Sequence, residues 1–183
     1  MKNLRILITL LLLTGLGKPA SADILGLSFG ALAGISTLST NNEFGMGTGA
    51  LGFGARVGIE FLSTLSVNAE WTYMSTTPAN TTTGYTSNFS TADLSADLII
   101  NIIPTKLRLF FGPKVGQGWT AAGGYSGSST TIGGEVGADF FMGSTWSLGA
   151  ETTYLSVGAP TLNGTTGNTG SLFQMLAAIK YWL

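Results

Sequence analysis

The residues that could do chemistry in this chain are its charged side chains, because the 183 residues include no His and no Cys. The lack of His removes the commonest general base near neutral pH and the commonest metal ligand. The lack of Cys removes disulfides, thiolate metal sites and Cys nucleophiles. A Ser beside an acidic residue is a poor nucleophile without a base. We therefore expect no enzymatic activity, no metal site and no cofactor.

The charged residues are few and regularly placed. Asp, Glu, Lys and Arg make up 9% of the sequence, against roughly 25% in a typical soluble domain. The formal net charge of −1 provides no basic surface for nucleic acid. Within segments that alternate between apolar and small or polar residues, the charges stand an even number of residues apart, which places them on one strand face. Such a face predicts ion pairing between strands.

Eight segments follow the period-two pattern of β-strands. Apolar residues occupy one face, and Gly, Ser and the charges occupy the other; of the fourteen charged side chains in residues 23–183, none falls on the apolar face. The segments are 24–35, 50–61, 65–73, 89–100, 106–119, 131–142, 145–155 and 171–183. The predicted interior charge network comprises Arg56, Glu60, Glu70, Asp93, Asp97, Arg108, Lys114, Glu135, Asp139, Glu151 and Lys180.

The connections between these segments alternate in length. They are short after the second, fourth and sixth segments, at 62–64, 101–105 and 143–144. After the others they run for about a dozen residues or more and are rich in Thr, Ser, Asn and Gly, a composition typical of loops. This order predicts an all-β, antiparallel up-and-down meander with both termini at the end of the short turns.

The second face decides between a soluble and a membrane barrel. A soluble domain would carry many charges on its solvent face, whereas here that face is mostly small residues and suits a confined interior. The continuous apolar face would aggregate in water. In lipid, strands must close into a barrel so that every backbone group is paired, and segments of this length cross a bilayer when tilted. The sequence therefore predicts an eight-stranded antiparallel up-and-down transmembrane β-barrel.

Aromatic residues gather near both ends of the predicted strands. Amphipathic rings prefer the two membrane–water interfaces, so two belts are expected. The predicted belt near the long loops contains Trp71, Tyr73, Trp119 and Tyr154, and the belt near the short turns contains Phe61, Phe140, Trp146 and Tyr181.

The first 22 residues have the organisation of a secretory signal peptide. Lys2 and Arg5 form a positive region, an apolar stretch follows, and Ala20-Ser21-Ala22 is a small-residue cleavage site. An uncleaved anchor helix is the alternative, but the apolar run is shorter than the ~20 residues that a span needs. We expect cleavage before Asp23, which leaves residues 23–183 as the barrel domain.

Residues 23–183 resemble the small eight-stranded outer-membrane barrels of the OmpA/OmpX-like class. The stretch Leu107–Gly118 is similar to the Pro- and Gly-spaced fifth strand of these barrels, and the last strand alternates to the terminus through Phe173, Ile179 and Tyr181. The resemblance implies a bacterial outer-membrane location, a lipid environment and recognition of the C-terminal strand by the barrel-assembly machinery. It also implies a monomer, and no peptidoglycan-binding domain is expected after the barrel.

The turns allow the pairing of the interior charges to be predicted. Because eight strands enclose only enough space for side chains, the charges must pair with each other or with trapped water. We expect either a salt-bridged plug or a narrow, gated channel with a weak preference for cations, since seven acids face four bases. The predicted neighbours are Arg56 with Glu70, Glu60 with Ser66, Asp97 with Arg108, Lys114 with Glu135, and Glu135 with Glu151.

The four long loops are the other candidate site. They span approximately residues 36–49, 74–88, 120–130 and 156–170, and their only charge is Glu43. The loops either keep the surface inert or recognise a surface ligand through hydrogen bonds and exposed groups such as Phe44, Met46, Tyr85 and Tyr125. The absence of Lys and Arg argues against strong binding of phosphates or nucleic acid there.

Overall fold

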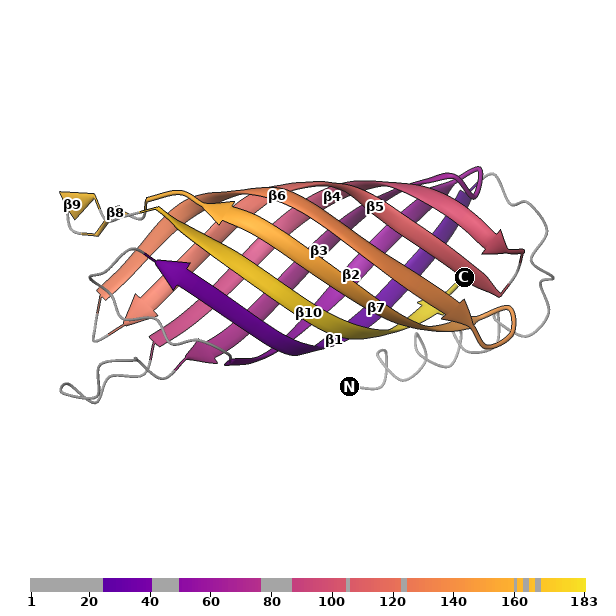
Figure 1. Ribbon diagram of the computed structural model, residues 1–183, viewed down its shortest axis with the longest axis horizontal. Helices are drawn as coiled ribbons and strands as arrows, with labels where there is room; N and C mark the ends of the chain where they lie inside the picture. Colours follow the sequence, from indigo (N-terminus) through magenta and orange to yellow (C-terminus); the bar gives the residue numbers. More distant parts are fainter. Residues whose placement is uncertain are drawn as a thin grey trace, which may run out of the picture.

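The chain folds into a closed antiparallel β-barrel. The computed structural model describes residues 25–40, 50–76, 87–104, 106–122, 125–159, 161–162, 165–166 and 169–183. Eight long strands form the wall, and two strands of two residues stand beside β6 (Figure 1). The strands are β1 (Leu25–Thr40), β2 (Ala50–Phe61), β3 (Leu65–Thr76), β4 (Ser87–Ile103), β5 (Leu107–Ala122), β6 (Tyr125–Phe141), β7 (Trp146–Val157), β8 (Thr161–Leu162), β9 (Thr165–Thr166) and β10 (Gly170–Trp182).

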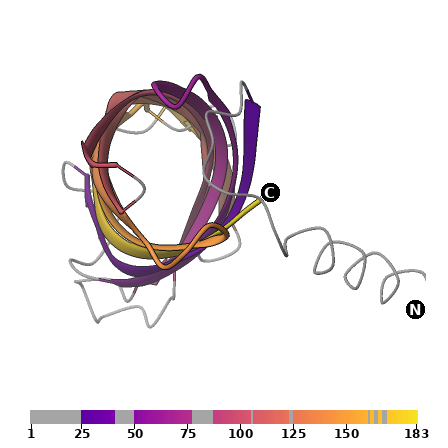
Figure 2. The ribbon, with the colours of Figure 1, turned by 90° about the vertical axis from the view of Figure 1, so that its right-hand side faces the viewer.

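Each long strand pairs with its neighbours in the chain, and β1 pairs with β10 to close the ring (Figure 2). Closure removes free sheet edges, so the backbone groups of the long strands find partners within the wall. The predicted eight-stranded up-and-down barrel is therefore confirmed. Within the described ranges, no helix is long and apolar enough to cross a membrane.

The strands run further toward the long-loop end than the sequence predicts. Strand β1 continues to Thr40 and β3 to Thr76. The predicted loop at 120–130 is wrong, because β5 and β6 stay paired as far as Ala122 opposite Tyr125. The Ser, Thr and Gly residues of this stretch are typical of loops, but their backbone N–H and C=O groups pair across the ladder like those of any strand. The polar composition therefore does not mark the end of the sheet.

The register between β4 and β5 differs from the prediction. Ser95 pairs with Lys114, and Arg108 pairs with Asn101 rather than with Asp97. A hydrogen bond of 3.0 Å from Lys106 N to Ile103 O closes a β-turn whose second residue is Pro104, a position that proline favours. The turn lies later in the chain than the predicted 101–105 connection, which moves every pair across it.

The register between β6 and β7 also corrects a prediction. Glu135 pairs with Thr153, and Glu151 pairs with Gly137, so the predicted pairing of Glu135 with Glu151 is wrong. A hydrogen bond of 2.8 Å from Met142 N to Trp146 O encloses a three-residue turn. Gly143 starts this turn with a φ of 98°, a backbone conformation that glycine adopts without strain.

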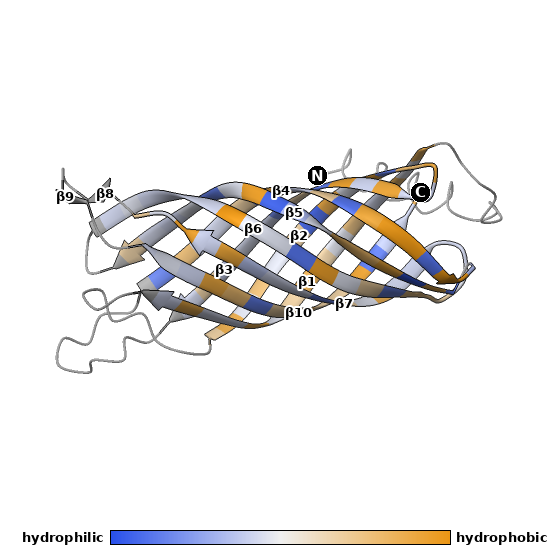
Figure 3. Cartoon of the chain, turned by 45° about the horizontal axis from the view of Figure 1, so that its top comes forward, coloured by the Kyte–Doolittle hydropathy of each residue, from blue (hydrophilic) through white to orange (hydrophobic). Residues whose placement is uncertain are grey.

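The two faces of the wall have opposite character, because hydrophobic and hydrophilic residues alternate along the strands (Figure 3). Large apolar side chains such as Leu51, Leu94 and Ile132 are exposed on the outer face, whereas the charged residues of the strands are buried inside, except for the half-buried Glu60. Such a surface suits lipid rather than water. All eight predicted belt residues lie on strands with exposed or half-buried side chains, Phe61 at the last position of β2.

Candidate functional site

The centre of the barrel holds a cluster of ion pairs around Arg56 of β2. Its Nη2 atom lies 2.5 Å from Glu70 Oε2 on β3 and 2.6 Å from Glu135 Oε2 on β6. Its Nη1 atom lies 3.0 Å from Glu151 Oε2 on β7. All four side chains are buried. One guanidinium group therefore connects four strands across the interior, and the predicted pairing of Arg56 with Glu70 is confirmed.

Lys114 of β5 completes this central cluster. Its Nζ atom lies 2.5 Å from Glu70 Oε1 and 3.0 Å from Glu135 Oε2. The predicted contact with Glu135 exists, although Lys114 pairs with Gly133 in the ladder and reaches Glu135 diagonally. Ser95 also donates a hydrogen bond of 2.8 Å to Glu135 Oε1. The cluster thus combines two cations with three carboxylates from five strands.

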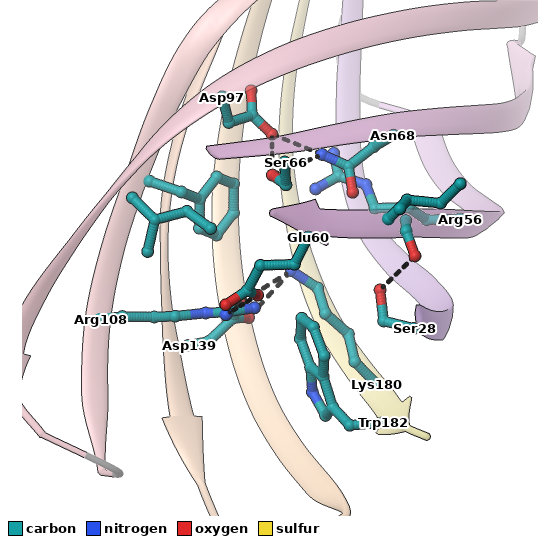
Figure 4. A pocket seen from close by; sticks show the side chains of 14 residues that line it. Ser28, Arg56, Glu60, Ser66, Asn68, Asp97, Arg108, Asp139, Lys180 and Trp182 are labelled. Atoms are coloured by element: carbon teal, nitrogen blue, oxygen red, sulfur yellow. Dashed lines mark hydrogen bonds and ion pairs between the residues drawn. The ribbon is translucent and has the colours of Figure 1, made fainter. Parts of the chain in front are cut away.

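A second charge cluster lies nearer the short turns. Arg108 forms ion pairs with Glu60 and with Asp139, the latter at 3.1 Å, and Lys180 lies 2.9 Å from Asp139 Oδ1 (Figure 4). The guanidinium of Arg108 also stacks over the ring of Trp182, 4.1 Å from its centroid. Two cations and two carboxylates balance each other here, and the indole covers them toward the end of the barrel.

The space between these side chains is small. The pocket that Figure 4 shows from close by has a volume of about 10 Å³, which is room for about one water molecule. The described side chains of this region therefore fill the bore almost completely.

Among these side chains, Glu60 pairs with Ser66 across β2 and β3, as the sequence predicts.

Two of the eleven network residues meet hydroxyl and amide groups instead of cations. Asp93 accepts a hydrogen bond of 2.6 Å from Thr131. Asp97, which was expected opposite Arg108, accepts one of 2.6 Å from Asn68. The other nine residues take part in ion pairs. The carboxyl groups of the interior therefore outnumber the cations, as the composition of the second face indicates.

An apolar layer inside the barrel was missed by the sequence reasoning. It lies toward the long-loop end, where the inward side chains of six strands are apolar and buried. The visible signal was the inner face of the last strand, where Leu172 and Leu176 interrupt the polar pattern. The other members stand at strand ends that the prediction assigned to loops or strand edges. The layer consists of Leu38, Ala50, Met74, Phe89, Leu155, Val157 and Leu172.

The carboxylates of Glu70, Glu135 and Glu151 approach each other closely enough to resemble a metal site, with one oxygen of each within 4.8 Å of the others. Arg56 contacts all three, however, and Lys114 contacts two of them. Cationic nitrogen atoms thus occupy the positions from which a metal ion would bind. The donor set is that of an ion-pair cluster.

One catalytic spacing is present in the sequence. Gly26-Leu27-Ser28-Phe29-Gly30 matches G-x-S-x-G, a motif in which the Ser stands on a sharp turn between a strand and a helix. Here all five residues lie within β1, and Ser28 Oγ donates to the carbonyl of Gly58 at 3.5 Å. The spacing follows from strand alternation and provides no exposed nucleophile.

The outward aromatic residues form contacts within each predicted belt. Tyr73 packs 5.1 Å from Phe53 and 6.3 Å from Trp71 between ring centroids. At the other end, Trp146 and Tyr181 meet edge to face at 5.0 Å. Of the loop residues that were expected to contact a surface ligand, Phe44, Met46 and Tyr85 lie outside the described residues, and Tyr125 belongs to β6. The predicted signal peptide, residues 1–22, also lies outside the described residues.

The family is decided by the sequence model of the outer membrane protein beta-barrel domain, which matches residues 8–174. The chain belongs to this family. The protein is accordingly an integral protein of the bacterial outer membrane, and membrane lipid surrounds its apolar wall. No curated protein matches the sequence.

Solved structures share the barrel fold. Neisserial surface protein A is 16% identical, with a TM-score of 0.64, and the match covers 88% of this chain and 98% of that one. Ail, the attachment invasion locus protein of Yersinia pestis, was solved with a heparin analogue; it is 16% identical with a TM-score of 0.52, covering 87% and 97%. A major outer membrane protein of Thermus thermophilus is 14% identical with a TM-score of 0.50, covering 88% and 100%.

Proposed function

We propose that the protein is a sealed outer-membrane barrel with a structural or surface-interaction role in adhesion or recognition, and that its interior charges act as a plug. The observation that carries this proposal is the set of ion pairs that Arg56 forms with Glu70, Glu135 and Glu151. They join opposite walls of a bore that has little room left for solvent. A sealed bore leaves the outward end of the barrel as the part that can interact.

The apolar layer supports the same proposal. Side chains such as Phe89 and Leu155 provide no hydrogen bonds that could replace the water shell of a passing ion. An ion that crossed the barrel would have to cross this layer as well as the charge clusters. Two different barriers in series therefore favour a silent barrel.

A narrow, weakly cation-preferring channel is the second candidate function. The excess of interior carboxyl groups over cations favours it, because such an excess attracts cations. In this case the ion pairs of Arg56 or Lys114 would open as a gate.

The partners follow from the barrel and its ends. We propose that β10, the C-terminal strand, is recognised by the barrel-assembly machinery, and that the barrel is a monomer. We also propose that residues 1–22 are removed as a signal peptide, leaving 23–183 as the membrane domain. The surface ligand would meet the long-loop end, where the sequence segments are neutral apart from Glu43.

Planar-bilayer recording tests the plug. The purified chain is folded in detergent, its folded state is established by heat-modifiable gel mobility, and its conductance is recorded beside that of Arg56→Ala and Lys114→Ala. The proposal expects a folded and silent wild type. Steady cation-selective openings of the wild type that change in either variant would replace the plug with a gated channel.

Adhesion of whole cells tests the surface role. Cells that display the protein are compared with cells that do not, on epithelial cells and on immobilised matrix proteins. The control replaces residues 41–49 and 77–86 with glycine–serine sequence of equal length. Adhesion that requires the native segments supports a recognition role, whereas equal adhesion of all three strains leaves the structural role.

A further inference from the structure

A groove on the outer wall near the long-loop end combines aromatic rings with hydroxyl groups. It has a volume of about 560 Å³, and its lining includes Tyr73, Asn88, Ser90, Trp119 and Ser128. Trp119 is 42% exposed. The groove lies outside the barrel, so neither the charge clusters nor the apolar layer contributes to it.

The ladder places the two aromatic residues on either side of a small one. Tyr73 pairs with Ser90, Ser90 pairs with Trp119, and Trp119 pairs with Ser128. Strands are about 4.8 Å apart, so the backbones of Tyr73 and Trp119 are separated by about 10 Å. The serine between them leaves a slot. A ring held in this slot needs about 4 Å between carbon atoms on each of its two sides, which is less in total than the separation of the backbones. One six-membered ring therefore fits between the two aromatic side chains.

The wall changes character at this level. Below the groove, the outward residues on the same strands are Leu94, Val115 and Ile132, all exposed. At the groove and beyond it they include Asn88, Ser126 and Ser128, which is the change expected where the lipid chains give way to polar headgroups. Aromatic rings such as Trp119 prefer that boundary. In an outer membrane, the groove would therefore face the sugars of the glycolipids in the outer leaflet.

The charges define the ligand further. Apart from the buried Asp93, none of the described residues between the central ion-pair cluster and the long loops is Asp, Glu, Lys or Arg. A phosphate or sulfate group would find no cation there. Ser hydroxyls and an Asn amide can both donate and accept hydrogen bonds, and the faces of Tyr and Trp are apolar platforms with a polar edge. This combination suits a neutral ring that carries hydroxyl groups.

The opposite belt provides an internal contrast. There Trp146 and Tyr181 are direct ladder partners, and their rings meet edge to face at 5.0 Å. The two rings fill each other's space, so no slot opens between them. The aromatic content of the two ends is similar, and among the described strand residues only the long-loop end has aromatic residues spaced by a serine.

We propose that the groove between Tyr73 and Trp119 binds a neutral saccharide of a glycolipid in the outer leaflet, with the sugar ring held between the two aromatic side chains. The inference deepens the proposed surface role, on which it rests for the outward orientation of the long loops. It places a recognition site on the wall of the barrel, separate from the loops at its end.

Nuclear magnetic resonance on the folded full chain in detergent tests the site. The probe is the saccharide released from a bacterial outer-membrane glycolipid by mild acid and then stripped of phosphate. We expect saturation transfer from the protein to the sugar ring, and a loss of affinity of about fivefold in Trp119→Ala and in Tyr73→Ala, since a lost stacking contact is worth about 1 kcal/mol. The matched control is Trp146→Ala, an equally exposed tryptophan of the opposite belt.

A second variant closes the slot while both rings remain. Ser90→Leu places a bulky apolar side chain between them on a wall that carries leucine elsewhere, so folding is expected to be unaffected. Loss of saccharide binding in Ser90→Leu with heat-modifiable mobility unchanged supports the slot. The proposal is overturned if the folded wild type gives no transfer, if Trp146→Ala loses binding equally, or if only the phosphorylated saccharide binds.

Failure of this inference and failure of the proposed function give different results. A silent wild-type barrel that does not bind the saccharide overturns the groove alone. A conducting barrel that binds the saccharide overturns the plug and leaves the groove standing. When the glycolipid shares a liposome with the protein, a blue shift of tryptophan emission that Trp119→Phe removes supports a ligand in the same membrane. A response only to saccharide added from outside would contradict that source.

Discussion

Arg56 of β2 and Glu70 of β3 are ladder partners, and Arg56 Nε and Nη2 lie 2.8 Å and 2.5 Å from the same carboxylate oxygen, Oε2. The guanidinium is simultaneously bound by Glu135 and Glu151 on the opposite wall. A pair that is local in the sheet is therefore the anchor of contacts that cross the whole interior.

Removing Arg56 should destabilise the barrel strongly. Arg56→Ala leaves Glu70, Glu135 and Glu151 close together with only Lys114 to balance them, and breaking a buried ion pair costs about 3–5 kcal/mol, less where water enters. Urea unfolding in detergent, followed by tryptophan emission, measures the loss. Lys106→Ala, at an exposed turn residue, is the matched control and should unfold like the wild type. An unchanged unfolding midpoint in Arg56→Ala would contradict the network.

Ion passage should require changes in the apolar layer as well as in the charge cluster. We expect Arg56→Ala alone to stay silent in planar bilayers, because Phe89 and Leu155 still close the bore. The triple variant Arg56→Ala, Phe89→Ser, Leu155→Ser should give openings that prefer cations. The control is a triple variant in which Leu94, which points outward from the same strand, is replaced with Ser in place of Phe89. This control should stay silent. Conductance of Arg56→Ala alone would make the charge cluster the sole barrier.

Disulfide trapping can test the β4–β5 register, since the natural chain contains no Cys to interfere. Leu98 pairs with Phe111, so the double variant Leu98→Cys, Phe111→Cys should oxidise readily, because ladder partners lie at a distance that a disulfide can span. In the register expected from the sequence, Leu98 would instead face Leu107. The variant Leu98→Cys, Leu107→Cys should remain reduced. Its efficient oxidation would instead support the register predicted from the sequence.

A methyl group at Gly112 should impair folding. A Cβ atom there would lie 2.6 Å from Asp97 Oδ1 and 2.8 Å from the carbonyl carbon of Ala96. Backbone cannot move aside as a flexible side chain can, and overpacking typically costs about 1–3 kcal/mol. Gly112→Ala should lower the folded fraction on a heat-modifiable gel. In Gly26→Ala the nearest atom would be 3.6 Å away, so this control should fold normally, and equal behaviour of both variants would contradict the close packing.

The sequence by itself determined the barrel and the side of the wall on which each strand residue lies. The alternation is local, and the lipid allows only closed sheets, so the eight strands and the buried position of residues such as Arg56 and Lys180 could be derived without coordinates. Short turns also predicted the β2–β3 register, because the turn at 62–64 leaves little freedom in pairing Arg56 with Glu70.

The tertiary structure alone decided the other registers and the contacts across the bore. The partner of Asp97 moved by four residues and that of Glu135 by two. Both shifts are even, because a slip by an odd number would turn apolar residues inward, whereas an even slip keeps every side chain on its face. Alternation therefore cannot distinguish such registers, and turn geometry chooses among them. The reach of Arg56 to Glu135 and Glu151 depends on barrel closure, which no local pattern encodes.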